Sequence, residues 1–329
     1  MQSPARGARP TSRRCVVTGA AGFIGSRLCD RLSRDGWTVL GIDGYTDSYD
    51  QAEKLLRAAR LTRTPGVCMV AGDLVTLDLP RLLAGSEVVF HLAGRAGVRA
   101  SFTQEARYVH DNVTATERLL RAGQQAGIRR VVYASSSSVY GDGRTPFTED
   151  DEPAPISPYG RTKLEAEKRC LAATSTGLEA VALRYFTVYG PGQRPDMGLR
   201  IFAEAALSGR PITLLGDGTQ RRDFTYVDDI VTATILAADA PASGLAINVG
   251  GGASVSLLDV LDLLRGMTAG ELTVEVHPQA RGDVRVTEAN LRRARDLLGF
   301  TAQTPFRVGF TNEVSWVRDR LAGLEVLSA

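Results

Sequence analysis

Short runs of apolar residues alternate along the chain with stretches that show helical periodicity. The runs have the length of strands, and they lie at 15–18, 37–42, 67–70, 87–92, 131–134, 181–185 and 246–249. Strands that are apolar on both faces and separated by helices indicate a parallel sheet covered by helices on both sides. The pattern therefore predicts an α/β fold with a doubly wound parallel sheet.

This regular pattern loosens after residue 187, where Gly and Pro become more frequent. We interpret the change as a smaller C-terminal lobe that binds substrate. The first residues are rich in Pro, Gly, Ser and Arg and lack an apolar core, which predicts a disordered tail. The expected organisation is a tail at 1–12, a Rossmann-type nucleotide-binding domain at 13–186 plus 223–249, and the lobe at 187–222 plus 250–329.

Composition narrows the class of protein. The 329 residues are 43% hydrophobic and 23% charged with a net charge of +2, as expected of a soluble globular chain. This charge favours neither nucleic acid nor an anionic membrane as a partner, and no apolar run reaches the roughly 18 residues of a membrane span. No signal peptide is recognisable, so we expect a cytoplasmic protein.

Cysteine and histidine contribute little chemistry. The four cysteines show neither a C-x-x-C motif nor metal-ligand spacing, and Cys15 and Cys68 lie in apolar runs. A small number of cysteines without such motifs is typical of proteins in a reducing compartment. The three histidines are widely scattered, and we therefore expect no metal site.

A glycine triplet follows the first predicted strand. Gly19 allows a tight turn, Gly22 lets the backbone approach a pyrophosphate, and Gly25 lets the helix pack closely on the strand. The helix that begins near Phe23 and Ile24 directs N–H donors and a positive dipole toward the phosphates. Together these features predict a dinucleotide site.

Other predicted strands end in residues that suit the same dinucleotide. Asp43 ends the second strand, where a carboxylate binds the ribose 2′-hydroxyl and repels a 2′-phosphate, so NAD is favoured over NADP. Asp73 and Leu74 follow the third strand, where the adenine edge would lie. Leu92 and Ala93 end the fourth, where the dinucleotide must pass.

Tyr159 and Lys163 form a candidate catalytic pair. Residues four apart on a helix share one face, and an ammonium beside a phenol lowers the tyrosine pKa. Only three of the 39 basic residues are lysines, so this spacing is informative. The serine run 135–138 precedes the pair, and the Ser136 hydroxyl could hydrogen-bond the same substrate oxygen. The three residues fit proton transfer during hydride transfer at a secondary alcohol.

These motifs resemble those of the extended short-chain dehydrogenase/reductases, in particular the nucleotide-sugar epimerases and among them the UDP-glucuronate 4-epimerases. The resemblance covers residues 13–320. It rests on the Tyr/Lys pair, on Asn112, and on the segments TGAAGFIG (18–25), HLAGRAGVRAS (91–101), YASSSSVYG (133–141), RYFTVYGPGQRPDM (184–197) and RRDFTYVDD (221–229).

The resemblance implies a reaction and roles for the residues. UDP-glucuronate and UDP-galacturonate would interconvert through a 4-keto sugar, with NAD as cofactor. Tyr159 would take the proton of the C4 hydroxyl, Lys163 would hold the nicotinamide ribose, and Ser136 would bind the C4 oxygen. Tyr185 is expected to contact the cofactor.

The resemblance also assigns the two ends of the substrate. Contacts to the sugar carboxylate are expected from Arg194, which can bind it in bidentate fashion, and from three hydroxyl groups. Candidates for the diphosphate are arginines, and an aspartate suits the uridine ribose. The expected substrate residues are Ser137, Ser138, Thr187, Arg194, Arg222, Arg281, Arg99 and Asp283.

Other functions are also compatible with the sequence at this point. The serine run carries no acid, which disfavours dehydratases and decarboxylases of this family. A UDP-glucose/UDP-galactose 4-epimerase is the main alternative, followed by an irreversible sugar reductase and a non-catalytic NAD-binding regulator. The family resemblance further implies a homodimer formed through the helices near 101–125 and 157–175.

Overall fold

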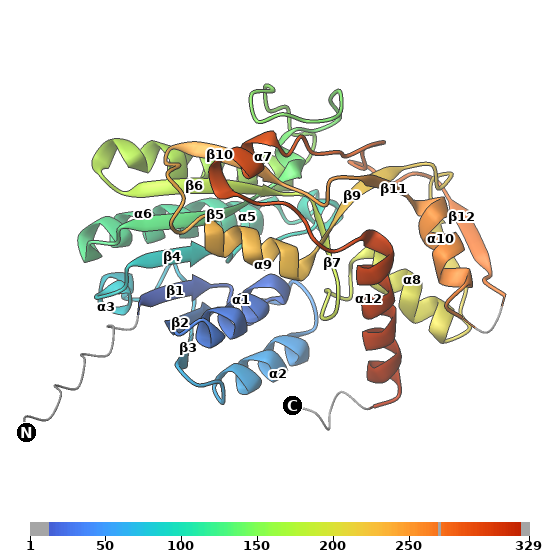
Figure 1. Cartoon of the computed structure of the whole chain (residues 1–329), viewed down its shortest axis with the longest axis horizontal. Coiled ribbons are helices and arrows are strands. Elements are labelled where there is room, and N and C mark those ends of the chain that lie inside the picture. Colours follow the sequence, from blue (N-terminus) through green and yellow to red (C-terminus); the bar gives the residue numbers. More distant parts are fainter. Residues whose placement is uncertain (1–12, 269–270, 324–329) are drawn as a thin grey trace, which may run out of the picture.

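A seven-stranded parallel sheet forms the centre of the first domain (Figure 1). The computed structural model describes residues 13–268 and 271–323, so the predicted tail at 1–12 lies outside the described residues. The strand order is β10-β6-β5-β4-β1-β2-β3, and every neighbouring pair is parallel. The strands are β1 (Arg14–Thr18), β2 (Thr38–Asp43), β3 (Val67–Ala71), β4 (Val88–His91), β5 (Arg130–Ser136), β6 (Glu179–Tyr185) and β10 (Leu245–Val249). The prediction of a doubly wound α/β fold is confirmed.

Helices cover both faces of this sheet, and successive strand residues enter opposite cores, as the alternation of side chains along a strand requires. Val17 packs in the core beneath α1 (Phe23–Arg34), α2 (Gln51–Leu61), α9 (Val227–Leu236) and α11 (Arg292–Leu298). Val16 packs in the core beneath α3 (Leu79–Leu83), α6 (Ala115–Ala126) and α7 (Pro158–Ala172). Among the described helices, none is both long enough and apolar enough to cross a membrane.

A second lobe lies beside the sheet (Figure 1). It has its own core, whose aromatic residues include Tyr189, Phe224 and Phe310. Its strands are β7 (Thr187–Tyr189), β8 (Ile212–Leu215), β9 (Arg221–Tyr226), β11 (Ser254–Ser256) and β12 (Val274–His277), and its helices are α8 (Gly198–Leu207), α10 (Leu257–Arg265) and α12 (Phe306–Leu321). The domain limits given above stay a prediction. Within 250–329, α11 packs against the first domain and α12 in the core of the lobe.

Short helices connect these elements near the carboxyl ends of the strands. They include α4 (Val98–Ser101) and α5 (Glu105–Tyr108), followed by a π-helix at Val109–Thr114 that runs into α6. A 3₁₀ turn follows β5 at Ser137–Val139, and a second, at Ala173–Thr176, connects α7 to the amino end of β6.

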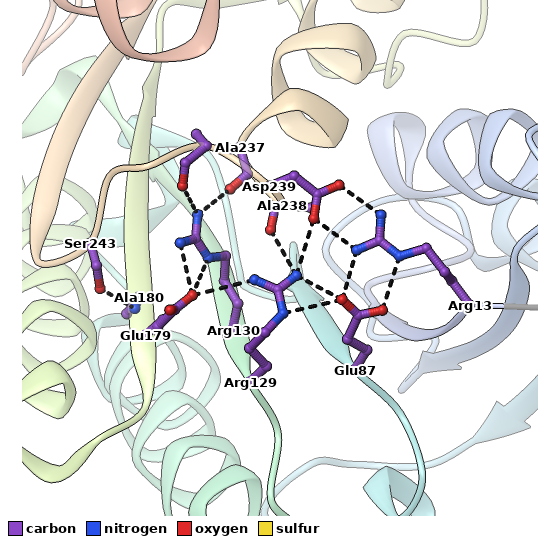
Figure 2. Close-up of polar contacts among 11 residues, drawn as sticks. Arg13, Glu87, Arg129, Arg130, Glu179, Ala180, Ala237, Ala238, Asp239 and Ser243 are labelled. Carbon is purple, nitrogen blue, oxygen red and sulfur yellow. Dashed lines mark hydrogen bonds and ion pairs between the residues drawn. The ribbon is translucent and has the colours of Figure 1, made fainter.

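The amino ends of the strands are joined by a network of charged side chains (Figure 2). Glu87, just before β4, binds Arg13 and Arg129, each at 2.8 Å. Arg13 and Arg129 also bind Asp239, which follows α9, at 2.7 and 3.1 Å. This network fastens the edge of the sheet that faces away from the carboxyl ends of the strands.

Candidate active site

A cavity of about 580 Å³ opens at the carboxyl ends of the parallel strands. This is the edge at which ligands bind in open α/β sheets. The structure brings most of the predicted site residues into its lining: Gly19, Gly22, Phe23, Ile24, Gly25, Asp43, Asp73, Leu74, Leu92, Ala93, Ser136, Ser137, Ser138, Tyr159, Lys163, Tyr185, Thr187 and Arg194. Residues that lie up to 175 positions apart in sequence therefore share one site.

The glycine turn between β1 and α1 fits a pyrophosphate. A Cβ at Gly25 would lie 2.0 Å from the Gly19 carbonyl oxygen, and one at Gly22 would lie 3.0 Å from it, so the turn has no room for side chains. Gly22 is the N-cap of the 12-residue helix α1 and provides no side-chain cap. The first N–H groups of α1 are thus left for an anion.

Asp43 is held in a fixed orientation at the end of β2. Its Oδ2 accepts a hydrogen bond from the Ala21 N–H at 2.9 Å, and its Oδ1 accepts one from the Tyr45 N–H at 2.8 Å. Burial raises the pKa of Asp43, and these two backbone donors act in the opposite direction. Each carboxylate oxygen keeps a further lone pair with which it can accept a ribose hydroxyl. The glycine turn and Asp43 together fit a dinucleotide without a 2′-phosphate.

Tyr159 reaches the cavity from the first turn of α7. Ser157 caps this helix by accepting from the Gly160 N–H at 3.1 Å. A Cβ at Gly160 would lie 2.5 Å from the Ser138 carbonyl oxygen, so the helix begins directly against the serine segment. This close approach places Tyr159 beside Ser136, whose side chain hydrogen-bonds it.

The ionisation of Tyr159 differs from the sequence-based expectation. Burial raises the pKa of Tyr159, and the Ser136 hydrogen bond and the Arg194 charge lower it by less. Lys163, which we expected to lower this pKa, instead has its ammonium 4.4 Å from the centre of the Tyr133 ring. Burial also lowers the pKa of Lys163 to about 8, because the charged ammonium is costly to desolvate.

Asn112 supports the site from the π-helix. Its side chain accepts from the Arg95 N–H at 2.7 Å and donates to the Arg95 carbonyl at 3.1 Å and to Thr162 Oγ1 at 2.9 Å. These bonds join the segment after β4 to α7 next to Lys163. π-Helical turns are frequent at functional sites because they shift a side chain out of the regular helical register.

His91 has a structural role below the cavity. Its ring nitrogens lie 2.7 Å from Thr18 Oγ1 and 2.9 Å from Thr116 Oγ1, and burial lowers its pKa to about 3. The ring is therefore neutral, and it joins β1, β4 and α6. Thr18 Oγ1 also accepts from the Ala93 N–H at 3.1 Å, which fixes the turn after β4.

Arg194 enters the cavity from the loop after β7 and is 18% exposed. It binds Asp196 in bidentate fashion, with Nε to Oδ1 at 3.0 Å and Nη2 to Oδ2 at 2.7 Å. Its guanidinium carbon is 5.9 Å from the centre of the Tyr49 ring. One edge of the guanidinium thus faces Asp196, and the Nη1–Nη2 edge is still available to a second carboxylate.

The predicted residues for the UDP end lie beside the cavity and not in its lining. Arg222 hydrogen-bonds Asp283, and the Arg281 guanidinium carbon is 4.4 Å from the centre of the Phe102 ring. A Cβ on the intervening Gly282 would lie 3.0 Å from Phe102 and from Val98, a cavity residue. Arg99 is the neighbour of Val98 on α4.

Sequence reasoning missed several residues that line the cavity, among them Asp196, Tyr49 and Lys54. Lys54 donates to the Thr46 carbonyl at 2.6 Å and to Ser48 Oγ at 3.0 Å. Asp196 lies in the segment 184–197, which resembles the epimerases, and Tyr49 follows Asp43 by six residues. Their proximity to Arg194 could have been inferred only from the fold.

Comparison with known proteins agrees with this geometry. The sequence matches the NAD dependent epimerase/dehydratase family over residues 15–250. It is 38% identical to the uncharacterized UDP-glucose epimerase YtcB of Bacillus subtilis, an alignment that covers 94% of this chain and 99% of that protein.

Two solved relatives contain both a cofactor and a UDP-sugar. MoeE5, in complex with UDP-glucuronic acid and NAD, is 43% identical, with a TM-score of 0.85 and coverage of 93% of this chain and 99% of MoeE5. UDP-glucuronic acid 4-epimerase from Bacillus cereus, in complex with UDP-glucuronic acid and NAD, is 35% identical, with a TM-score of 0.90 and the same coverage of both chains. The chain belongs to the NAD-dependent epimerase/dehydratase family.

Proposed function

We propose that the protein is an NAD-dependent UDP-glucuronate 4-epimerase. The observation that carries the proposal is that Arg194 and Tyr159 share one cavity, close enough for the arginine charge to lower the tyrosine pKa. In glucuronate the carboxylate is attached to C5, the carbon next to C4. A carboxylate bound by Arg194 would therefore bring the C4 hydroxyl toward Tyr159 and Ser136.

The residues of the cavity suit a reversible oxidation at C4. Bound there, NAD would supply a hydride acceptor at C4 that allows the hydride to return to the opposite face of the sugar. Tyr159 takes the proton of the C4 hydroxyl and later gives it back, while Ser136 hydrogen-bonds the same oxygen. Lys163 holds the nicotinamide ribose, and the glycine turn with Asp43 holds the adenosine diphosphate end.

The carboxylate contacts also protect the 4-keto intermediate. A 4-keto glucuronate is a β-keto acid, and it loses CO₂ when the bond to the carboxylate aligns with the ketone. Arg194, together with Thr187, Ser137 and Ser138, holds the carboxylate away from that alignment. Residues 136–139 contain no acid, so this segment supplies no carboxylic acid as proton donor for elimination of a hydroxyl.

Product analysis on two sugars tests the proposal. The protein is incubated with NAD and either UDP-glucuronate or UDP-glucose, and the products are resolved by chromatography. We expect UDP-galacturonate to form much faster than UDP-galactose. Faster UDP-galactose would support the second candidate, a UDP-glucose 4-epimerase, which is favoured by the similarity to YtcB. Accumulation of NADH without either product would contradict both.

We further propose a cytoplasmic homodimer formed through helices α6 and α7. Support for the compartment comes from the four cysteines, none of which is in a disulfide. The outward faces of these helices carry exposed charges of both signs, Arg118, Arg121, Arg161 and Glu165, which could pair across the contact. Light scattering at low and high salt tests the dimer: a contact of this kind should weaken as salt screens the charges.

A further inference from the structure

The loop that carries Arg194 is held through its main chain. It runs from β7 to α8, and two arginines bind the carbonyl groups of the two residues immediately before Arg194. Arg57, on α2, donates to the Gly192 carbonyl at 2.9 Å, and Arg200, on α8, donates to the Gln193 carbonyl at 2.7 Å. The position of Arg194 thus depends on where these two guanidinium groups lie.

Both guanidinium groups meet at one buried carboxylate, Glu53, which is 5% exposed. Arg57 Nη2 lies 3.1 Å from Glu53 Oε2, and Arg200 binds both oxygens, at 3.0 and 2.6 Å. Arg320, on α12, reaches Oε1 at 2.9 Å. Charged hydrogen bonds are strong in such a buried site, and an unpaired charge there is costly.

Glu53 also connects the two parts of the molecule. It lies on α2, which packs in the first domain, whereas Arg200 and Arg320 lie on α8 and α12 of the lobe (Figure 1). The cavity opens near this junction, and both Gly44 beside the cofactor turn and Arg194 line it. Glu53 therefore fixes the loop of Arg194, the proposed ligand of the sugar carboxylate, relative to the cofactor site.

We propose that Glu53 is a positioning residue for Arg194, and so a determinant of selectivity for UDP-glucuronate over neutral UDP-hexoses. The inference rests on the proposed function. Without the Glu53 charge, Arg200 would keep Glu204 at 2.7 Å and Arg57 would keep the Tyr49 hydroxyl at 2.9 Å. The two guanidinium groups would then share no counter-ion and would move apart. The Gly192 and Gln193 carbonyls would lose their donors, and Arg194 would shift. A displacement of about 1 Å at a reacting group can cost on the order of 10²-fold in rate.

Glu53→Gln tests this inference through kcat and KM on both sugars. We expect the ratio of kcat/KM for UDP-glucuronate to that for UDP-glucose to fall about tenfold, mainly through a higher KM for the uronate. Tyr159 serves both sugars, so any change in its pKa cancels in the ratio. A general loss of folded protein cancels in the same way. Arg57→Gln removes the Gly192 bond and the Arg57 contacts with Glu53 and Tyr49, but it leaves Arg200 bound to Glu53 and to the Gln193 carbonyl. It should therefore lower the ratio less, and it provides a second test if Glu53→Gln does not fold.

Glu87→Gln is the control, because Glu87 also binds two arginines but lies in the network at the opposite edge of the sheet (Figure 2). It should lower thermal stability and leave the ratio unchanged. An unchanged ratio in folded Glu53→Gln and Arg57→Gln overturns the inference, as does an equal fall in Glu87→Gln. A wild-type protein that does not prefer UDP-glucuronate overturns the proposed function instead.

Discussion

Tyr159 combines burial with two polar neighbours, Ser136 and Arg194, which come from other elements of the fold. As the proposed acid–base group, it should be indispensable to proton transfer at C4. We expect Tyr159→Phe to lower kcat by about 10²–10⁴-fold, the usual contribution of a positioned acid–base group, in a protein that still folds. Initial rates with UDP-glucuronate measure this effect. A variant that kept more than about a tenth of the wild-type rate would not fit the role.

Arg194 should act on the acidity of Tyr159 as well as on the sugar. Its positive charge favours the phenolate, so removing it raises the pKa of Tyr159. If the phenolate is the active form, activity rises with pH through this pKa, and Arg194→Met should move the rise to higher pH. The pH profile of kcat/KM with UDP-glucose measures the shift, because the neutral sugar needs no carboxylate contact. A rise at the same or lower pH would contradict the assignment.

The residues that could be predicted from sequence are those whose chemistry depends on local spacing. Tyr159 and Lys163 lie on one helix face because they are four apart, and the glycine triplet follows from the tight turn after β1. The pKa of Tyr159 could not be predicted, since burial raises it and its polar neighbours come from β5 and the loop after β7. The pairing of Arg194 with Asp196 likewise depends on the conformation of that loop.

At the scale of elements, α12 holds the start of the loop that carries Arg194. The Gly190 N–H donates to Glu313 Oε2 at 2.9 Å, and burial raises the pKa of Glu313 to about 8 from a reference value of 4.5. Between these two values the folded protein binds a proton that the unfolded chain does not. The stability contributed by this group is therefore present below about pH 4.5, and it is lost as pH rises through about 8.

Glu313→Gln should remove this dependence, because the amide keeps an acceptor for Gly190 and does not ionise. The urea midpoint of the wild type should fall more between pH 6 and pH 9 than that of the variant. Asp223, whose pKa burial raises to about 6, is present in both proteins and cancels in the comparison. Parallel curves for the two proteins would show that Glu313 does not titrate in this range.

Strands and helices of the first domain were predictable because burial on both faces leaves continuous apolar runs. The shorter elements were not. The π-helix at Val109–Thr114 places Asn112 against Arg95 and Thr162, and these contacts join residues 17 and 50 positions away. Residue propensities do not predict such a π-helical turn, because its formation depends on tertiary contacts.

At the scale of the whole molecule, the two parts meet through pairs that are remote in sequence, such as Glu53 with Arg200 and Arg320, 147 and 267 positions apart. Charge patterns along the chain do not indicate these pairs, since arginine supplies 36 of the 39 basic residues and many could serve. The position of the lobe relative to the cavity therefore could not be predicted from the sequence.

The dinucleotide should stabilise the folded chain, since the glycine turn and Asp43 are arranged for it only after folding. A ligand that binds the native state alone, at a hundred times its Kd, raises the free energy of unfolding by about 2.7 kcal/mol. NAD should therefore raise the thermal midpoint, and NADP should raise it less at the same concentration. The difference arises because Asp43, held by the Ala21 and Tyr45 N–H groups, repels a 2′-phosphate.

Thermal unfolding with each dinucleotide measures this difference in thermal midpoint. Asp43→Asn is the matched variant, in which the preference for NAD should shrink. Equal stabilisation of the wild type by NADP would place the ribose away from Asp43.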